Sequence, residues 1–226
     1  MKKLDSVSSK RIVTVATEIF ALHGYHGSSI REITQKAGVN LAAIHYHVGD
    51  KKSLYMAVLV SFLRPINQSR LVKLAEAVKH YEPRPVPLPL VIELFARPFF
   101  DLTQSKTEGG SAKSRLFGRS MVEPLPFADN LLAKELHPVI AQFSKAIRRH
   151  APDVAPQRFM WRLNFIVGAM HHTLAIMHRM KNLTDGLCED DNPGTAFRYF
   201  SEFAVANLAT LSSAGTDGAM RADFPT

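Results

Sequence analysis

The sequence contains one cysteine, Cys188, among its 226 residues. A lone cysteine excludes a disulfide within the chain. The charged opening of residues 1–5 is not followed by the apolar run that a secretory signal requires. The most apolar stretch, residues 163–177, carries Asn164 and two histidines and is shorter than the roughly 20 residues of a membrane span. We therefore expect a cytoplasmic protein without a membrane partner, in which this stretch is a buried helix.

The usual signatures of catalysis are also missing. The sequence has no His-Glu-x-x-His motif, no glycine-rich phosphate loop and no cysteine cluster. His171 and His172 are adjacent and point about 100° apart on a helix, and His178 follows two turns after His171. These histidines allow a metal or haem site, although core histidines are more common. We expect no enzyme activity, no catalytic residue, no metal and no cofactor; an all-α enzyme that uses the histidines is the competing hypothesis.

The charge balance favours an anionic partner. The formal net charge is +8 and the isoelectric point about 9.7, which suits nucleic acid or a membrane surface. Residues 1–52 hold eight Lys or Arg against four Asp or Glu, so half of the excess charge lies in under a quarter of the chain. An apolar fraction of 46% is typical of a soluble folded protein, and the length suits a small domain joined to a larger one.

Local signals near the start of the chain predict a helix-turn-helix. Apolar residues at helical spacing predict a first helix over about residues 9–23. Ser29 and Glu32 form a capping-box pattern that starts a second, short helix. Gly38 then supplies the turn, and Asn40 caps a third helix. Two short helices joined by a three-residue turn match the helix-turn-helix pattern.

The rest of the chain has helical rather than alternating periodicity, so no strand is predicted. A fourth, longer helix opens at Lys51, and Pro65 should kink or shorten it because proline removes a backbone hydrogen bond. A run of prolines over residues 83–89 predicts an extended connector. Further helices are expected over about residues 88–104, 112–122, 126–150, 156–181 and 194–212.

The third helix carries the side chains that would read DNA. A recognition helix offers short or polar side chains to base edges in the major groove, while donors around it hold phosphates. Asn40 could bond a phosphate or an adenine edge, and His45 could donate to a base or a phosphate. Leu41 and Ala42 could pack on thymine methyl groups. The surrounding phosphate clamps would be Ser29, Arg31, Tyr46, His47 and Lys51.

Residues 37–54, AGVNLAAIHYHVGDKKSL, are similar to the Ala-Gly-Val-Ser-x-x-x-Leu-Tyr-Tyr-His-Phe-x-x-Lys-x-x-Leu pattern of the TetR family of bacterial repressors. The resemblance implies that Tyr46, His47 and Lys51 are structural or contact phosphates, and that residues 40–45 form the variable reading surface. Two departures matter. His45 stands where a tyrosine is usual, and Ala43 stands where many members place a threonine that bonds a phosphate. Ala43 cannot make that bond.

The same resemblance implies an all-α fold of about nine helices and a homodimer formed by the last two long helices. Residues 1–54 would be the DNA-binding domain, residues 55–213 the ligand-binding and dimerisation domain, and residues 214–226 a flexible tail. The last two long helices are apolar on more than one face, which independently calls for cover by a partner subunit. The expected interface residues are Leu174, Met177, Phe200, Phe203 and Leu208.

We expect an apolar effector pocket between helices of the larger domain. Arg97, Arg115 and Arg119 could anchor a carboxylate or phosphate head group there, or simply reach solvent. Residues 40–43, with residues 63–65 and 161–163, faintly resemble TetR-family members that answer to fatty acids. The candidate pocket residues, which plain core positions also explain, are Phe95, Phe99, Phe117, Met121, Phe143, Trp161, Phe165, Met170 and His171.

Together these features predict a ligand-responsive transcriptional regulator, most simply a repressor. As a homodimer it would bind a near-palindromic double-stranded operator, because two recognition helices must enter major grooves about 34 Å apart. A small, hydrophobic or fatty-acid-like effector would release it. An activator or an architectural DNA binder without a ligand is the alternative. A large second domain rich in Met and Phe argues against the architectural version, since holding DNA requires no such body.

Overall fold

All regular secondary structure in the computed structural model is helical over the residues that it describes, which are 7–40, 49–104, 110–188 and 192–213. This confirms the predicted all-α fold. Within these ranges, no helix is long and apolar enough to cross a membrane. The helices are α1 (Val7–His23), α2 (Ile30–Ala37), α4 (Lys51–Tyr81), α5 (Leu88–Gln104), α6 (Gly110–Ser120), α7 (Pro126–Arg148), α8 (Pro156–Ile176), α9 (Met180–Leu183) and α10 (Pro193–Ser213).

Helices α1 and α2 form as the local signals predict. The apolar stripe of α1 is buried, and α2 adds Ile33 and Ala37 to the same core. The Ser29 hydroxyl accepts a hydrogen bond from the Glu32 backbone N–H at 3.1 Å, and Gly38 ends α2 in the left-handed region at φ 63°. The Glu32 carboxylate lies 3.7 Å from the His23 ring nitrogen instead of returning to Ser29. Only the first half of the predicted capping box therefore forms.

Helix α4 is one continuous element of 31 residues. Asp50 caps it, because its carboxylate accepts from the Ser53 backbone N–H at 2.7 Å. The helix passes through Pro65 and continues to Tyr81, so Pro65 does not shorten it, and the kink that was the other expectation stays a prediction. Burial along α4 extends from Leu54 to Leu74, and packing against α1, α5 and α7 outweighs the hydrogen bond that proline removes.

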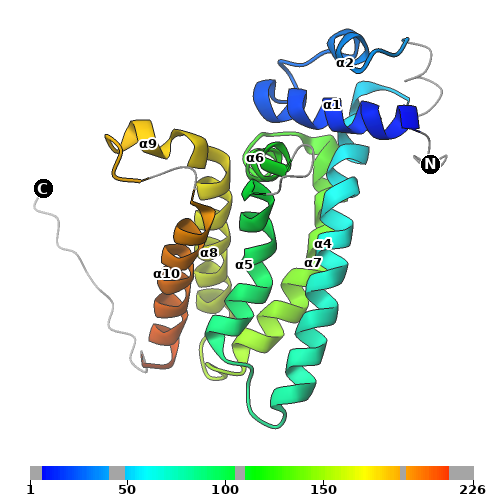
Figure 1. Cartoon of the computed structure of the whole chain (residues 1–226). Coiled ribbons are helices and arrows are strands. Elements are labelled where there is room, and N and C mark those ends of the chain that lie inside the picture. The colour runs from blue at the N-terminus through cyan, green and yellow to red at the C-terminus, as the bar shows by residue number, and fades with distance from the viewer. Residues whose placement is uncertain (1–6, 41–48, 105–109, 189–191, 214–226) are drawn as a thin grey trace, which may run out of the picture.

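Figure 1 shows α1 lying across one end of a bundle in which α4, α5, α7, α8 and α10 run along a common direction, while α6 crosses beneath α1. Helix α6 packs against α1, α5 and α8, and α10 packs against α5 and α8. In the core, the rings of Phe99 from α5 and Phe117 from α6 are stacked, with centroids 4.0 Å apart. The α1 and α2 segment, here called the head, therefore rests on a helical body.

The predicted helix over residues 156–181 is interrupted. Helix α8 ends at Ile176, a short 3₁₀ turn follows over Met177–Arg179, and α9 then begins at Met180. Near its end α8 passes very close to α6: a Cβ atom added at Gly118 would lie 2.6 Å from the backbone oxygen of His171 and 2.6 Å from the backbone nitrogen of Ala175. Only glycine permits this crossing without a backbone shift.

We expect Gly118→Ala to lower the free energy of unfolding by about 1–3 kcal/mol, the usual cost of overpacking a well-packed core. Chemical denaturation followed by circular dichroism measures this change. The matched control is Ser111→Ala, an exposed position on the same helix, which should change stability by less than about 0.5 kcal/mol. Equal stabilities for the two variants would contradict the close α6–α8 contact.

Candidate nucleic-acid interface and effector cavity

Four of the predicted DNA-contacting residues lie in the described part of the chain. Ser29 caps α2, Arg31 is exposed in its first turn, and Asn40 is exposed just after the Gly38 turn. Lys51 opens α4 and is half-buried. The remaining predicted contacts lie outside the described residues: Leu41, Ala42, Ala43, His45, Tyr46 and His47.

Lys51 has a structural contact that the phosphate hypothesis did not include. Its ammonium group donates a hydrogen bond to the Ser28 backbone carbonyl and lies 4.6 Å from the centre of the Tyr25 ring. Partial burial lowers the pKa of Lys51, and the nearby Glu123 carboxylate opposes this shift. The side chain therefore ties the first turn of α4 to the loop that precedes α2.

The contacts of one carboxylate, that of Glu123, form a joint between the head and the body. The Glu123 carboxylate, just after α6, accepts from the Tyr25 backbone N–H at 3.0 Å and from Arg119 Nε at 3.1 Å. Gly24 precedes Tyr25 at φ 72°, and a Cβ atom there would lie 2.2 Å from the Arg119 guanidinium. The left-handed backbone angle at this bend favours glycine, and a Cβ there would also push the Arg119 side chain away from its present position.

Aromatic rings complete this joint. The Tyr25 ring lies 4.7 Å from the Phe127 ring of α7 and 5.4 Å from the Tyr55 ring of α4, measured between centroids. Tyr55 also packs edge-on against Phe20 of α1 at 5.0 Å. Tyr55 is fully buried, and this burial raises the pKa of its hydroxyl group. The head is therefore packed against α4 and α7 as well as bonded through Glu123.

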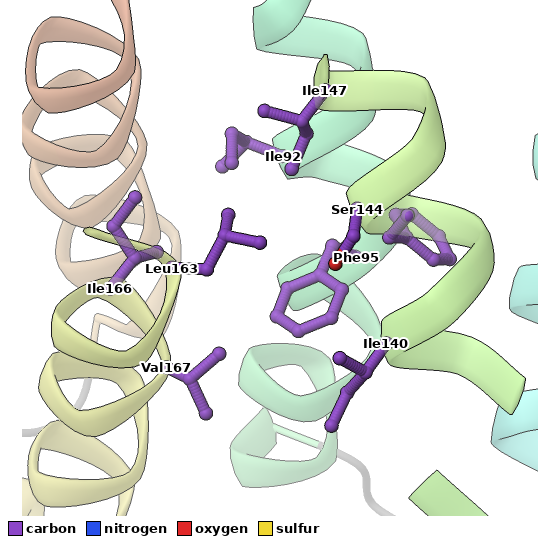
Figure 2. A pocket seen from close by; sticks show the side chains of 9 residues that line it. Ile92, Phe95, Ile140, Ser144, Ile147, Leu163, Ile166 and Val167 are labelled. Carbon is purple, nitrogen blue, oxygen red and sulfur yellow. The ribbon is translucent and has the colours of Figure 1, made fainter. Parts of the chain in front are cut away.

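A small apolar cavity lies inside the body between α5, α7 and α8. Its volume is about 30 Å³, and Ser144 is the one polar side chain that lines it. Figure 2 shows Phe95 near its middle, with Leu163 and Val167 of α8 on one side and Ile140 of α7 on the other. The lining residues are Ile92, Phe95, Ile140, Phe143, Ser144, Ile147, Leu163, Ile166 and Val167.

Two of the nine predicted pocket residues, Phe95 and Phe143, line this cavity. Four others are buried elsewhere in the core, Met121 is half-buried, and Trp161 and Phe165 are each 55% exposed on α8. Helical spacing alone does not distinguish cavity lining, buried core and exposed surface, because apolar side chains occur at the same periodicity in all three. The four buried residues outside the cavity lining are Phe99, Phe117, Met170 and His171.

Sequence reasoning missed a buried guanidinium beside the cavity. Arg70 of α4 is 2% exposed and lies among the rings of Phe95, Phe99 and Phe143, whose centres are 4.3, 5.0 and 5.4 Å from its central carbon. Nη1 donates to Asn67 Oδ1 at 2.9 Å, while Nε has no hydrogen-bond partner. Burial lowers the pKa of Arg70 to about 9, which leaves it protonated near neutral pH.

A signal for Arg70 was present, because it follows the buried Leu63 by seven residues on the same helical stripe. The arginines that the sequence favoured as anchors have other surroundings. Arg97 Nε lies 2.6 Å from the Asp101 carboxylate, and Arg119 pairs with Glu123. Arg115 lines a cleft between α1, α6 and the end of α8.

A larger hollow of about 650 Å³ opens between α8, α10 and the segment that joins them. Of the five predicted interface residues, Met177, Phe200 and Phe203 line it, and Phe203 is 47% exposed. Leu174 and Leu208 are covered by their own chain. In the described residues, no group of three or more His, Cys, Asp or Glu side chains is placed to hold a metal ion.

Two family models match the chain. The model described as "Bacterial regulatory proteins, tetR family" matches residues 12–58, and "Tetracyclin repressor-like, C-terminal domain" matches residues 93–207, which is half of the chain. The chain belongs to the TetR family. Its helix-turn-helix, its DNA binding and its role in transcription regulation are therefore those of this family.

Individual relatives match over a short part of the chain. The chain is 37% identical to the transcriptional repressor AcnR of Corynebacterium glutamicum over 51 residues, which are 23% of this chain and 27% of AcnR. It is 37% identical to the transcriptional activator FasR of Mycolicibacterium smegmatis over 49 residues, 22% of each protein. The chain thus matches under a third of the length of these relatives.

The fold is shared with a solved structure over nearly the whole chain. The structure of the SmeT–triclosan complex superposes with a TM-score of 0.58 over 89% of this chain and 91% of SmeT, at 15% sequence identity. Identity this low shows a shared fold alone. The regulator family and this all-α fold are those of DNA-binding proteins rather than of enzymes.

His171 is buried against the Phe117 ring, and the two ring centroids are 4.8 Å apart. We expect this burial to make the stability of the body sensitive to acid. Burial, assisted by the charge of Arg70, lowers the pKa of His171 from 6.5 to about 4. Between these values the unfolded chain binds a proton that the folded chain does not. Stability therefore falls as the pH drops through this window, by on the order of 3 kcal/mol at most.

We expect His171→Leu to flatten the dependence of the melting temperature on pH between 6.5 and 4, measured by differential scanning fluorimetry. His137→Leu, at an exposed position on α7, is the control and should keep the wild-type slope. A wild-type slope in the His171 variant would show that another group controls acid unfolding.

Proposed function

We propose that this protein is a ligand-responsive TetR-family repressor that binds a near-palindromic operator as a homodimer and is released by a small apolar effector. The observation that carries the proposal is the joint at Glu123 and Tyr25, where the helix-turn-helix head is bonded to a body that holds an apolar cavity. A body attached in this way can pass a change in its packing to the head. Because the proposed partner is operator DNA, we propose that the protein acts in the cytoplasm of a bacterium, where the chromosome lies.

We propose residues 1–54 as the DNA-binding domain, which includes the head, residues 55–213 as the ligand-binding and dimerisation domain, and residues 214–226 as a flexible tail. Helix α4 runs through the boundary at residue 54, so the division is one of function rather than a break in the chain. The exposed Arg31 and the capped start of α2 suit phosphate contacts, and the exposed Asn40 at the turn suits a contact to a base. The third helix, with Leu41, Ala42, Ala43 and His45, remains the proposed reading surface.

For dimerisation, we propose the outer face of α8 and α10. This face carries Trp161, Phe165, Tyr199 and Phe203, which are 55%, 55%, 60% and 47% exposed. The Trp161 and Phe165 rings are in contact, with centroids 5.8 Å apart. Exposed aromatic side chains that gather on one face of a chain commonly mark a protein interface. A second copy of this chain would cover them and would set the spacing of the two heads.

For regulation, we propose that an effector enters the body between α5, α7 and α8. The SmeT structure, which shares this fold, is a complex with the small molecule triclosan. Control by an effector needs a coupling free energy between sites, and ~3 kcal/mol corresponds to a change in DNA affinity on the order of 100-fold. The relatives include the repressor AcnR and the activator FasR, so activation is the alternative that a reporter assay with and without the protein distinguishes.

Arg31 and Asn40 test the division between phosphate contacts and sequence reading. Fluorescence anisotropy at several salt concentrations compares DNA from upstream of the protein's own gene with a shuffled control, and we expect a preference of about 10³-fold. Arg31→Ala should weaken binding to both DNAs equally and reduce the salt slope by about one. Asn40→Ala should lower the preference itself about tenfold.

The control for this experiment is Arg84→Ala, which removes the same charge from an exposed position in the turn after α4. It should leave both affinities within about twofold, because the Debye length is about 8 Å at physiological salt. Uniform losses for all three variants would refute the proposed division. No binding of the wild type to either DNA at low salt would refute the proposed function.

Phe165→Glu tests the dimer face, because a charge buried in an apolar interface opposes association. We expect the wild type to sediment with a mass of about 50 kDa, twice the 25.2 kDa of the chain, and the variant to sediment as a monomer. Val72→Glu, on α4 at a side chain that is 57% exposed, is the matched control and should remain dimeric. A dimeric Phe165→Glu would exclude this face as the interface.

A further inference from the structure

We propose that the effector is a single-headed anion with an apolar chain, whose carboxylate binds Arg70 and whose chain occupies the cavity between α5, α7 and α8. This inference rests on the proposed function, because it names the chemical class of the effector. It differs from the sequence-based expectation in the identity of the anchor: Arg70 replaces Arg97, Arg115 and Arg119.

The first step is the charge of Arg70. The side chain is 98% removed from solvent, and no Asp or Glu of the described residues forms an ion pair with it. Moving a guanidinium from water into an apolar interior without a counterion is strongly unfavourable. A buried ion is stable when a partner of opposite charge and a full set of hydrogen bonds accompany it. Among the described residues, Arg70 has no such counterion, and its Nε has no hydrogen-bond partner.

Among the described residues, the hydrogen bonds of Arg70 involve Nη1 and leave its Nε donor unused. Asn67 donates through Nδ2 to the Glu135 backbone oxygen at 2.8 Å, so its Oδ1 is left to accept from Arg70 Nη1. This contact is neutral and does not offset the charge. The Nε donor has no partner. The side of a guanidinium that carries Nε is an edge through which it binds a carboxylate with two parallel hydrogen bonds.

The second step is the position of Arg70 relative to the cavity. Phe95 and Phe143 contact the guanidinium and also line the cavity, and their ring centroids are 5.2 Å apart. The guanidinium and the cavity therefore share two aromatic side chains, Phe95 and Phe143. The Phe95 side chain lies between the α7 and α8 residues that line the cavity (Figure 2). Phe95 makes no hydrogen bond or ion pair, so its movement is the step by which we expect the ligand to reach Arg70.

The third step is the chemistry of the lining. Eight of the nine lining side chains are apolar, none is charged, and Ile140 at its edge is 38% exposed. An apolar chain gains from burial there, while a second charged group on the ligand would find no partner among these residues. The cavity volume of about 30 Å³ has space for little more than a water molecule, so a ligand chain enters only when the lining side chains of α5, α7 and α8 move apart. Because the lining has no charged side chain, it offers no partner for the additional charges of a nucleotide or another polyanion.

Calorimetric titration with dodecanoate and with dodecan-1-ol, both below their aggregation concentrations, tests this proposal directly. The two probes share a chain length and differ in the head group. We expect the wild type to bind dodecanoate at least tenfold more tightly than the alcohol. Arg70→Met should remove this difference while keeping the affinity for the alcohol, and Arg70→Lys should keep part of it because the charge remains.

Arg97→Met is the matched control, since it removes an arginine that already pairs with Asp101 in the same body. It should keep the wild-type preference for dodecanoate. Arg70→Met should also melt no lower than the wild type without ligand, because an apolar side chain replaces an unpaired buried charge.

Two results would overturn the inference: equal affinities of the wild type for the acid and the alcohol, or a preference for the acid that survives in Arg70→Met. The second would place the carboxylate elsewhere, such as on the exposed face of α8 and α10. The effect of dodecanoate on DNA binding is measured separately by anisotropy. Binding of dodecanoate at Arg70 without release of DNA would contradict the proposed regulation and would support this site.

Discussion

The structure depends on the continuity of α4, which belongs to the cores of the head and of the body at once. Tyr55 near its start packs against Phe20 of α1, and Arg70 lies among the phenylalanines of the body. These two residues are 15 positions apart, which is about 22 Å along a helix. Both are fully buried, so a displacement of α4 at one end requires repacking at the other. A helix of this length transmits such a displacement, because its backbone hydrogen bonds resist bending.

The second attachment of the head makes its orientation depend on more than α4. Glu123 holds the Tyr25 backbone from the end of α6, and Phe127 packs on Tyr25 from the start of α7. The head is therefore attached both through α4 and to the start of α7, and α7 also forms part of the cavity wall together with α5 and α8. A closely packed joint of this kind changes between discrete arrangements rather than deforming smoothly.

Local sequence signals predicted most of the fold, and long-range packing accounts for what they missed. The cap at Ser29, the turn at Gly38 and the helix starting near residue 88 depend on neighbouring residues alone, and all three are confirmed. The passage of α4 through Pro65, the break after Ile176 and the burial of Arg70 depend on contacts with distant segments. The exposure of Trp161 has the same origin, since a helix that is apolar all round does not reveal which side faces its own core. The predicted reading helix lies outside the described residues, so its contacts remain predictions.

An unpaired buried charge explains why an empty body and an occupied body can differ in free energy. A ligand shifts an equilibrium only by the difference between its affinities for the two states. A neutral apolar ligand gains the burial of its chain, which depends little on the exact position of α4. An anion gains in addition the interaction with Arg70, which falls steeply with distance and exists only where Phe95 has moved aside. Because Arg70 belongs to α4 and Phe95 to α5, this gain couples the occupancy of the cavity to the relative position of two helices. One of these helices continues into the head, so the same charge that destabilises the empty body would give the ligand its control over DNA binding.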